Sequence, residues 1–224
     1  MKANDTDPNP ANLRREYSQR GLSRENLDPD PIVFFRGWFK EATEAGILEP
    51  NAMVLATVGA DQQPTQRTVL MKAYDERGFV FFTNYTSRKA QQISENDHVS
   101  ALFLWLPLER QVAITGRAVR ISTLESLAYF ASRPLGSRLG AWVSHQSKVI
   151  PSRKVLEIKL AEIRQKFANG EVPLPDFWGG YRIEPDTIEF WQGNASRLHD
   201  RFLYTARLDE EKRRTAWQID RLSP

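Results

Sequence analysis

Hydrophobic side chains recur at helical spacing in one segment near the start of the chain. Asp30 and Pro31 form the N-cap and first-turn signal of a helix, and Gly46 is a natural stop. The positions between them that share one helical face are Ile32, Phe35, Trp38, Phe39 and Ala42. We therefore predict a helix that begins at Pro31, ends before Gly46 and packs its aromatic face into the core.

Most of the remaining chain shows the patterns of short strands joined by turns. The strand patterns cover residues 52–58, 65–74, 79–83, 99–106, 111–121, 180–183, 187–191, 199–205 and 215–221. Turn residues at 61–64 and 75–78 separate the first three strands, as is typical of consecutive antiparallel hairpins.

Four further helices are predicted between these strands. They cover residues from 86 or 87 to 94, from 122 to 133, from 136 to 143 and from 152 to 168. Ser122 and Glu125 fit a capping box, and Pro134 disfavours helical geometry at Arg133. Gly170 is the expected C-cap of the last helix, whose apolar face contains Leu156, Leu160, Ile163 and Phe167.

Together these elements predict a mainly β fold with peripheral helices, built as an antiparallel barrel. The sequence contains no internal repeat and no linker of the kind that separates domains. We expect one domain over residues 13–224, preceded by a polar, proline-containing tail at residues 1–12 that is disordered.

Composition narrows the kind of ligand that such a barrel would bind. The 224 residues are 41% hydrophobic, and 31 basic against 28 acidic side chains leave a formal charge of +3. Because the two signs are interspersed, small anionic ligands are favoured over a nucleic-acid backbone. The start of the chain lacks a signal-peptide pattern, and no run approaches the about 18 apolar residues of a membrane span. We expect a soluble, cytoplasmic protein with no membrane partner.

Several kinds of reactive site are excluded or disfavoured by residue counts. The chain has no cysteine, which rules out disulfides, thiolate metal sites and a cysteine nucleophile. Its three histidines, His98, His145 and His199, are widely separated and lack metal-ligand spacing, so no catalytic metal is expected.

The first candidate site lies near the C-terminus. In an extended strand, Arg197, His199 and Arg201 would project from the same face and could bind an anion. Trp191 would offer a flat surface to an aromatic ligand. An exposed polar strand face explains the same residues equally well.

A second group of cations lies in the first half of the chain. Arg67 and Lys72 belong to one predicted strand, and Thr83 and Ser87-Arg88-Lys89 follow at a strand end and a helix start. Guanidinium, ammonium, hydroxyl and helix N-terminus are the groups that hold phosphate. Alternation places Arg67 and Lys72 on opposite faces, so one site uses both only if the ligand wraps an edge or the strand is irregular. Ordinary surface charge is the alternative.

A third group comprises Tyr129, Arg133 and Ser137. Tyr129 and Arg133 are four residues apart on one helix face, and Ser137 follows Pro134. These residues could form a second phosphate site, although such a pair is also common on solvated helix faces.

Seven motifs, in this order, resemble the pyridoxamine 5'-phosphate oxidase family over residues 13–224. They are Arg67 to Lys72, Ser87 to Lys89, Leu108 to Val112, Ser132 to Pro134, Trp142 to Ser147, Pro173 to Gly180 and Arg197 to Phe202.

The resemblance implies a split β-barrel homodimer that binds FMN at the subunit interface. It also implies oxidation of pyridoxamine 5'-phosphate or pyridoxine 5'-phosphate to pyridoxal 5'-phosphate, in vitamin B6 cofactor biosynthesis and salvage. Hydride would pass to flavin N5, and dioxygen would then be reduced to hydrogen peroxide, with ammonia released from the amine substrate.

The resemblance also implies roles for individual residues. FMN would be bound by Arg67, Val69, Leu70, Lys72, Thr83, Ser87, Arg88, Lys89, Gln111, Gln146, Ser147, Trp191 and Arg201. The substrate would be bound by Lys72, Tyr129, Arg133, Ser137, Arg197 and His199, with Arg14 to Tyr17 as a flap. Arg197 and His199 would lie nearest the chemistry, and no role is assigned to His145.

One segment departs from the family pattern, because Asn194-Ala195-Ser196 stands where small or glycine-rich, variable residues are expected. All three residues are small, so the loop should still form. Two alternatives remain open. One is a related split barrel that binds flavin or haem without oxidase activity, and the other is a platform for single-stranded nucleic acid. The interspersed charges argue against the second.

Overall fold

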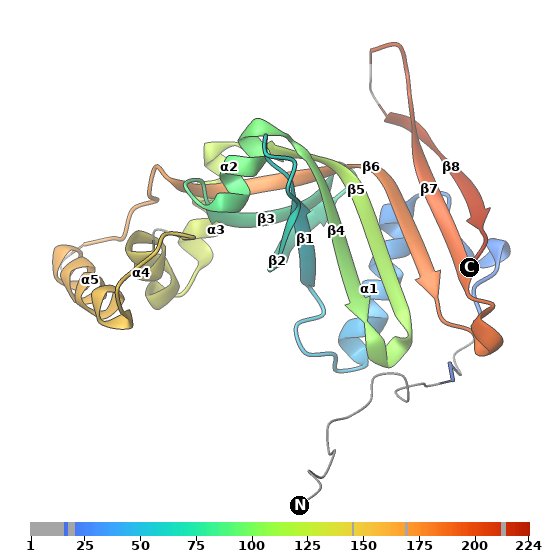
Figure 1. The fold of residues 1–224 in the computed structure, drawn as a ribbon, viewed down its shortest axis with the longest axis horizontal. Coiled ribbons are helices and arrows are strands. Elements are labelled where there is room, and N and C mark those ends of the chain that lie inside the picture. Colours follow the sequence, from blue (N-terminus) through green and yellow to red (C-terminus); the bar gives the residue numbers. More distant parts are fainter. Residues whose placement is uncertain (1–15, 18–20, 145, 169, 212–213) are drawn as a thin grey trace, which may run out of the picture.

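The computed structural model, which describes residues 16–17, 21–144, 146–168, 170–211 and 214–224, contains one antiparallel sheet. The strand order is β3-β2-β1-β4-β5-β6-β7-β8, and an additional β3–β6 pairing closes the first six strands into a barrel (Figure 1). This confirms the predicted mainly β fold with peripheral helices. The predicted tail at residues 1–12 lies outside the described residues.

The elements follow the predicted order. The strands are β1 (Ala52–Thr57), β2 (Thr65–Asp75), β3 (Gly78–Asn84), β4 (His98–Trp105), β5 (Arg110–Arg120), β6 (Trp178–Gln192), β7 (Asp200–Leu208) and β8 (Arg214–Leu222). The helices are α1 (Pro31–Glu44), α2 (Arg88–Glu95), α3 (Thr123–Ser132), α4 (Leu135–Val143) and α5 (Arg153–Lys166), with short 3-10 turns η2 (Arg24–Asn26), η3 (Leu106–Leu108) and η4 (Ala195–Arg197).

The strand β6 corrects one prediction, because the two strands expected at 180–183 and 187–191 form a single strand. It pairs with β5 along both halves, but its other edge changes partner from β3 to β7 near Pro185. A bulge in β6 accommodates Pro185, which has no N–H to donate: Thr115 and Gly116 of β5 pair with Thr187 and Pro185, and Asp186 is the extra residue. A Cβ on Gly116 would lie 2.1 Å from the Glu184 carbonyl oxygen, so only glycine permits this close approach.

The helix α1 supplies much of the barrel core. Asp30 caps it by accepting a hydrogen bond from the Ile32 N–H, as predicted. Phe35 is fully buried and contacts Phe79 and Phe103 at ring-centroid distances of 5.0 and 5.2 Å. The predicted aromatic face is therefore core packing.

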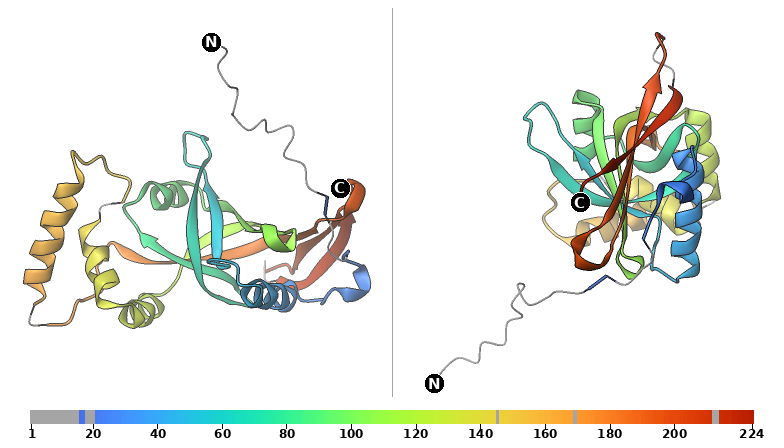
Figure 2. Two further views of the ribbon diagram at one scale, coloured as in Figure 1. Left: turned by 90° about the horizontal axis from the view of Figure 1, so that it is seen from below. Right: turned by 90° about the vertical axis from the view of Figure 1, so that its right-hand side faces the viewer.

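The helices α3, α4 and α5 lie toward one end of the molecule, away from the β7–β8 hairpin (Figures 1 and 2). The capping box of α3 is present, with Ser122 and Glu125 satisfying each other's backbone N–H groups. A second apolar cluster joins these helices to Trp178. The C-cap of α5 is Phe167, not Gly170 as predicted, because the helix ends at Lys166, two residues before its predicted end.

Within the part of the chain that the structure describes, no helix is long and apolar enough to cross a membrane.

Candidate functional site

A polar pocket of about 310 Å³ opens between β2, β3, α2 and α3. It brings together residues from the second and third predicted groups. The described lining residues are Thr68, Val69, Leu70, Lys72, Phe82, Thr83, Lys89, Tyr129, Arg133, Gln146 and Trp178. This lining contains three cationic side chains and no carboxylate, so the pocket is suited to an anion.

Lys89 and Arg67 form the cationic centre of this region. The Lys89 ammonium donates to Thr83 Oγ1 and Gln146 Oε1, both at 3.1 Å, and neither partner neutralises its charge. Burial and the nearby Arg67 guanidinium lower the pKa of Lys89 from 10.5 to about 8. A bound anion would relieve this unfavourable burial of charge.

Neutral oxygens from β1 and from its own strand β2 hold the Arg67 guanidinium. It donates to the Leu55 carbonyl at 3.0 Å and to Thr57 Oγ1 and Thr65 Oγ1 at 2.6 and 2.5 Å. Burial, followed by repulsion from Arg88, lowers the pKa of Arg67. Its orientation is thereby determined while its positive charge remains available to a ligand.

The start of α2 lies beside this centre, as the sequence predicts. Ser87 is fully buried, and its hydroxyl accepts from the Ala90 N–H as the helix N-cap. The exposed Arg88 directs its backbone N–H to Ser147 Oγ at 3.2 Å. The hydroxyl of Ser87 thus has a structural partner, and Ser147 is brought to the helix N-terminus.

Lys72 lines the pocket and lies at an irregularity of β2. The register with β3 shifts between Met71 and Ala73, which leaves Lys72 as the extra residue of a bulge. The strand is thus irregular at Lys72, but Arg67 is not among the described lining residues of the pocket.

Aromatic rings position Tyr129 and Arg133 on the opposite wall. Tyr129 stacks on Phe82 with a centroid separation of 4.0 Å, and the Arg133 guanidinium lies 4.8 Å from the Trp178 ring centroid. Arg133 Nη1 is buried and has no hydrogen-bond partner among the described residues. Burial lowers the pKa of Arg133, and a ligand acceptor would satisfy the unpaired nitrogen. Ser137 is exposed on α4 and is not among the described lining residues.

A separate cluster of rings surrounds His199. Its ring centroid lies 4.7 Å from that of Trp191 and 5.3 Å from that of Tyr17. Tyr17 also meets Trp191 edge-on at 5.7 Å. Trp191 is in register with Gln111 on β5 and with Arg201 on β7, so these predicted flavin-ring residues form one row across the sheet.

The predicted common strand face of Arg197, His199 and Arg201 is wrong for Arg197. Arg197 ends the 3-10 turn η4 with φ 61°, and β7 begins only at Asp200. Arg201 pairs with Glu189, at 2.7 Å from Nε and 3.2 Å from Nη2. Arg201 is therefore fixed in place by a carboxylate and is less available to an anion than expected.

The two groups do not meet within one chain. The described residues of the pocket lining include none from η4 or β7. The α3 end and the β6–β7 connection lie toward opposite ends of the molecule in Figure 1 and in the left-hand view of Figure 2. Arg14 and His145 fall outside the described residues.

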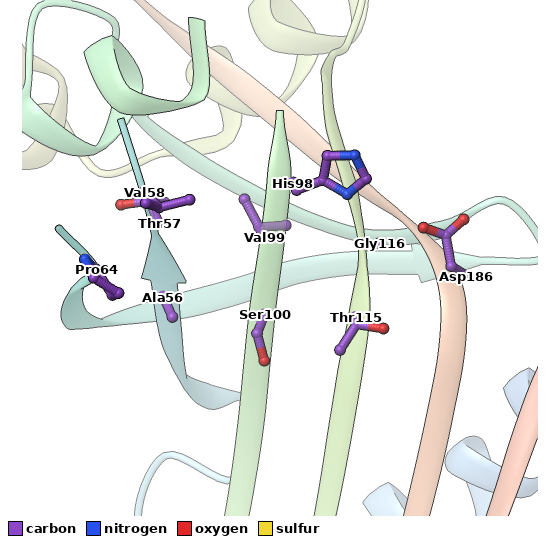
Figure 3. Close-up of a pocket in the computed structure, with 10 residues that line it drawn as sticks. All are labelled: Ala56, Thr57, Val58, Pro64, His98, Val99, Ser100, Thr115, Gly116 and Asp186. Carbon is purple, nitrogen blue, oxygen red and sulfur yellow. The ribbon is translucent and has the colours of Figure 1, made fainter. Parts of the chain in front are cut away.

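Another cavity, of about 340 Å³, lies between β1, β4, β5 and Asp186 of β6 (Figure 3). Its lining is largely small or apolar, with His98 and Asp186 at its edge. None of the predicted site residues lines it. Among the described residues, no group of three potential metal ligands is found.

Sequence reasoning missed several residues that orient the site. Thr57 and Thr65 hold Arg67, Trp178 stacks with Arg133, and Asn194 contacts His199. Trp178 had a usable signal, since it follows the proline-rich motif. The contact of Thr57 depends on the pairing of β1 with β2 and had no local signal, whereas Thr65 lies two residues before Arg67 on the same strand.

The sequence model described as "Pyridoxamine 5'-phosphate oxidase" matches residues 39–167. The chain belongs to the pyridoxamine 5'-phosphate oxidase family. A second model, described as "Pyridoxine 5'-phosphate oxidase C-terminal dimerisation region", matches residues 178–224. The two matches together cover the described lining of the polar pocket and, in the ring cluster, Trp191 and His199, and they confirm the predicted family.

Curated relatives in this oxidase family are similar over their whole length. A pyridoxine/pyridoxamine 5'-phosphate oxidase from Crocosphaera subtropica is 60% identical over 212 residues, covering 95% of this chain and 98% of the relative. One from Escherichia fergusonii is 54% identical over 224 residues, covering 100% of both chains. The protein is thus an enzyme of this family.

Solved structures give the same fold. PhzG from Burkholderia lata, in complex with tetrahydrophenazine-1-carboxylic acid, matches with a TM-score of 0.84 and 28% identity, covering 94% of this chain and 100% of that chain. An FMN-binding protein from Nostoc punctiforme, related to the family, matches with a TM-score of 0.67 and 17% identity over 89% of this chain and 100% of that chain. The second similarity concerns the fold alone.

Proposed function

We propose that the protein is an FMN-dependent oxidase that converts pyridoxamine 5'-phosphate and pyridoxine 5'-phosphate to pyridoxal 5'-phosphate. The main support is the polar pocket, in which Lys72, Lys89 and Arg133 converge without a carboxylate among the described lining residues. The full-length relatives named pyridoxine/pyridoxamine 5'-phosphate oxidase support the choice of substrate. The reaction would serve vitamin B6 cofactor biosynthesis and salvage.

The residues around Lys89 fit the phosphate and ribityl chain of FMN. Arg67 and Lys89 supply positive charge that no described partner neutralises, and the N-terminus of α2 adds backbone N–H groups. When bound, FMN would accept hydride from the substrate at N5 and pass the electrons to dioxygen, yielding hydrogen peroxide and, from the amine, ammonia. The proposed FMN-binding residues are Arg67, Val69, Leu70, Lys72, Thr83, Ser87, Arg88, Lys89, Gln111, Gln146, Ser147, Trp191 and Arg201.

The opposite wall of the pocket fits the substrate phosphate. Arg133 offers a buried, unpartnered Nη1, and Tyr129 and Lys72 lie beside it. In this proposal Ser137 adds a hydroxyl at the start of α4. Arg197 and His199 hold the substrate ring, and the segment from Arg14 to Tyr17 closes over it.

We further propose a homodimer in which each FMN lies between two chains. The strand β6 places Trp178 in the polar pocket and Trp191 in the ring cluster, 13 residues apart. At about 3.3 Å per residue this separation is roughly 40 Å along the strand, too far for one FMN and one substrate to span. A second copy would bring the two groups together. The relation of residues 178–224 to a dimerisation region supports this arrangement.

The continuous sheet from β3 to β8 supports the proposal that residues 13–224 form a single FMN-binding domain. A related barrel that binds flavin without oxidising the substrate is the competing function. That function would not require Tyr129 and Arg133 to line the same pocket as Lys89, whereas binding of a substrate phosphate beside the flavin would.

An anaerobic flavin spectrum distinguishes these functions. Adding pyridoxamine 5'-phosphate to the FMN-loaded protein should bleach the flavin, and admitting air should restore it, with pyridoxal 5'-phosphate formed. If FMN binds but the substrate does not bleach it, the protein is a flavin-binding barrel without this oxidase activity. Absence of FMN binding would contradict both functions.

Mixed dimers test the shared site. Arg133→Ala and Arg197→Ala homodimers should each lose substrate oxidation, with FMN still bound to the Arg197→Ala protein. A heterodimer isolated with two affinity tags should regain about half of the wild-type activity, because one of its two sites carries neither substitution. An inactive heterodimer would show that both residues act from the same chain.

A further inference from the structure

The loop between β6 and β7 fixes His199 through its ring nitrogen. The backbone N–H of Asn194 donates to His199 Nδ1 at 3.1 Å. Trp191 and Tyr17 contact the imidazole ring, at centroid distances of 4.7 and 5.3 Å. The ring is therefore held by one directional hydrogen bond and by two aromatic neighbours.

This hydrogen bond determines the tautomer of the neutral ring. A backbone N–H can only donate, so Nδ1 must present its lone pair. In the neutral imidazole the proton then resides on Nε2. The other ring nitrogen of His199, Nε2, is consequently available as a hydrogen-bond donor.

The same loop contains unfavourable backbone geometry. Ser196 and Arg197 are consecutive non-glycine residues with φ of 56° and 61°, in the left-handed region. Side chains with a Cβ adopt this region at a conformational cost, so contacts elsewhere must hold the turn.

The Asn194 side chain provides such contacts. Its Nδ2 donates to the Leu198 carbonyl at 3.1 Å and to Asp200 Oδ2 at 2.6 Å, which ties the start of the loop to its end. Asp200 is buried and is itself anchored, because it accepts from the Leu22 N–H at 2.8 Å and from the Arg221 guanidinium. The loop is thus secured to the N-terminal segment and to β8.

We infer that Asn194 is a positioning residue: it holds His199 in the Nε2–H tautomer and keeps Arg197 in its left-handed turn. The expected effect of Asn194 on catalysis rests on the proposed function. The tautomer of His199 follows from the hydrogen bond alone and does not depend on that function.

The inference assigns a direction to the hydrogen bond between His199 and the substrate. With Nδ1 occupied by the Asn194 N–H, His199 acts on a substrate acceptor atom by donating from Nε2. It does not remove a proton through Nδ1 while that contact is present. Its contribution is then orientation of the ring and stabilisation of charge on the acceptor.

Nuclear magnetic resonance of the FMN-loaded protein, labelled with ¹⁵N at histidine, tests the tautomer directly. The signals of His199 are identified by their absence from a His199→Gln sample. We expect a protonated Nε2 and an unprotonated Nδ1 at neutral pH. A protonated Nδ1 in the wild-type protein would overturn the inference, whether or not the protein oxidises pyridoxamine 5'-phosphate.

The Asn194→Ala variant tests the side-chain tie. We expect kcat to fall about tenfold, the two tautomers of His199 to become mixed, and the FMN dissociation constant to change less than twofold. Asn26→Ala is the matched control, since it removes an asparagine whose side chain accepts from Ser23 outside the loop. It should leave the tautomer and kcat unchanged.

The outcomes separate this inference from the proposed function. An Asn194→Ala protein with wild-type kcat and an unchanged His199 tautomer would overturn the positioning role. If the wild-type protein bound FMN without oxidising the substrate, the proposed function would fall. The histidine spectra of the wild-type and Asn194→Ala proteins would then still decide whether Asn194 sets the tautomer.

Discussion

Lys89 should make FMN binding depend on pH in the alkaline range. Burial, followed by the Arg67 charge, lowers the pKa of Lys89 to about 8 in the ligand-free protein. Above this pH the free protein loses the lysine proton. A phosphate dianion favours the protonated ammonium and raises its pKa, so binding must take up a proton above pH 8. The affinity for FMN should therefore fall as the pH rises through 8.

The size of this effect follows from the fraction of protonated lysine. With a pKa of about 8, this fraction falls from about 90% at pH 7 to about 10% at pH 9. If Lys89 stays protonated in the complex, the apparent affinity should fall about tenfold over these two units. The ligand phosphate, whose second pKa is about 6, is a dianion throughout this range.

Quenching of FMN fluorescence at constant ionic strength measures the dissociation constant at each pH. Calorimetry in two buffers with different ionisation enthalpies should also detect proton uptake at pH 8.5. Lys89→Arg keeps its charge to higher pH and should give a flat profile. Lys89→Gln should bind weakly at every pH. A flat wild-type profile, or an Lys89→Arg profile with the wild-type slope, would refute the reasoning.

Three other substitutions test the packing and the site. Arg133→Lys keeps the charge but loses the planar contact with Trp178, so KM for pyridoxamine 5'-phosphate should rise about tenfold; an equal loss of FMN affinity would place Arg133 on the cofactor instead. Phe35→Ala empties the centre of the aromatic core and should lower the free energy of unfolding by about 3–5 kcal/mol in urea titrations of the flavin-free protein. An unchanged urea midpoint would contradict that role. Gly116→Ala forces a Cβ against the Glu184 carbonyl and should cost about 1–3 kcal/mol in the same titrations, whereas Gly136→Ala, with open space around it, should cost much less.

The local elements could be predicted because their signals are local. The Asp30 cap, the Ser122–Glu125 capping box and the strand periodicities each depend on residues close in sequence. The continuity of β6 could not be seen, because Pro185 normally ends a strand. It is tolerated here because β6 itself bulges beside the proline, leaving Asp186 without a partner on β5, and this irregularity becomes visible only in the pairing of the two strands.

For the candidate site too, local features could be predicted from the sequence and features that depend on tertiary contacts could not. The cations of the polar pocket were found because phosphate-binding residue types cluster in sequence. Their arrangement depended on the pairing of strands, such as the register shift at Lys72 and the β1 oxygens of Leu55 and Thr57 that hold Arg67. Arg197 was misplaced because alternation assumes an extended chain, whereas the chain makes a left-handed turn here. The Asn194 side chain ties this turn to Asp200, which the more distant Leu22 and Arg221 anchor.

The strand β6 connects both parts of the proposed site, because Trp178 near its start lies under Arg133 and Trp191 near its end contacts His199. In a two-fold dimer, the course of this strand would therefore set the spacing between the two active sites. That course is fixed at its middle, where Gly78 and Gly116 let neighbouring strands approach the backbone of Ile183 and Glu184. A side chain at either glycine would push these strands apart, so the same close packing that closes the barrel would also align the two halves of each site.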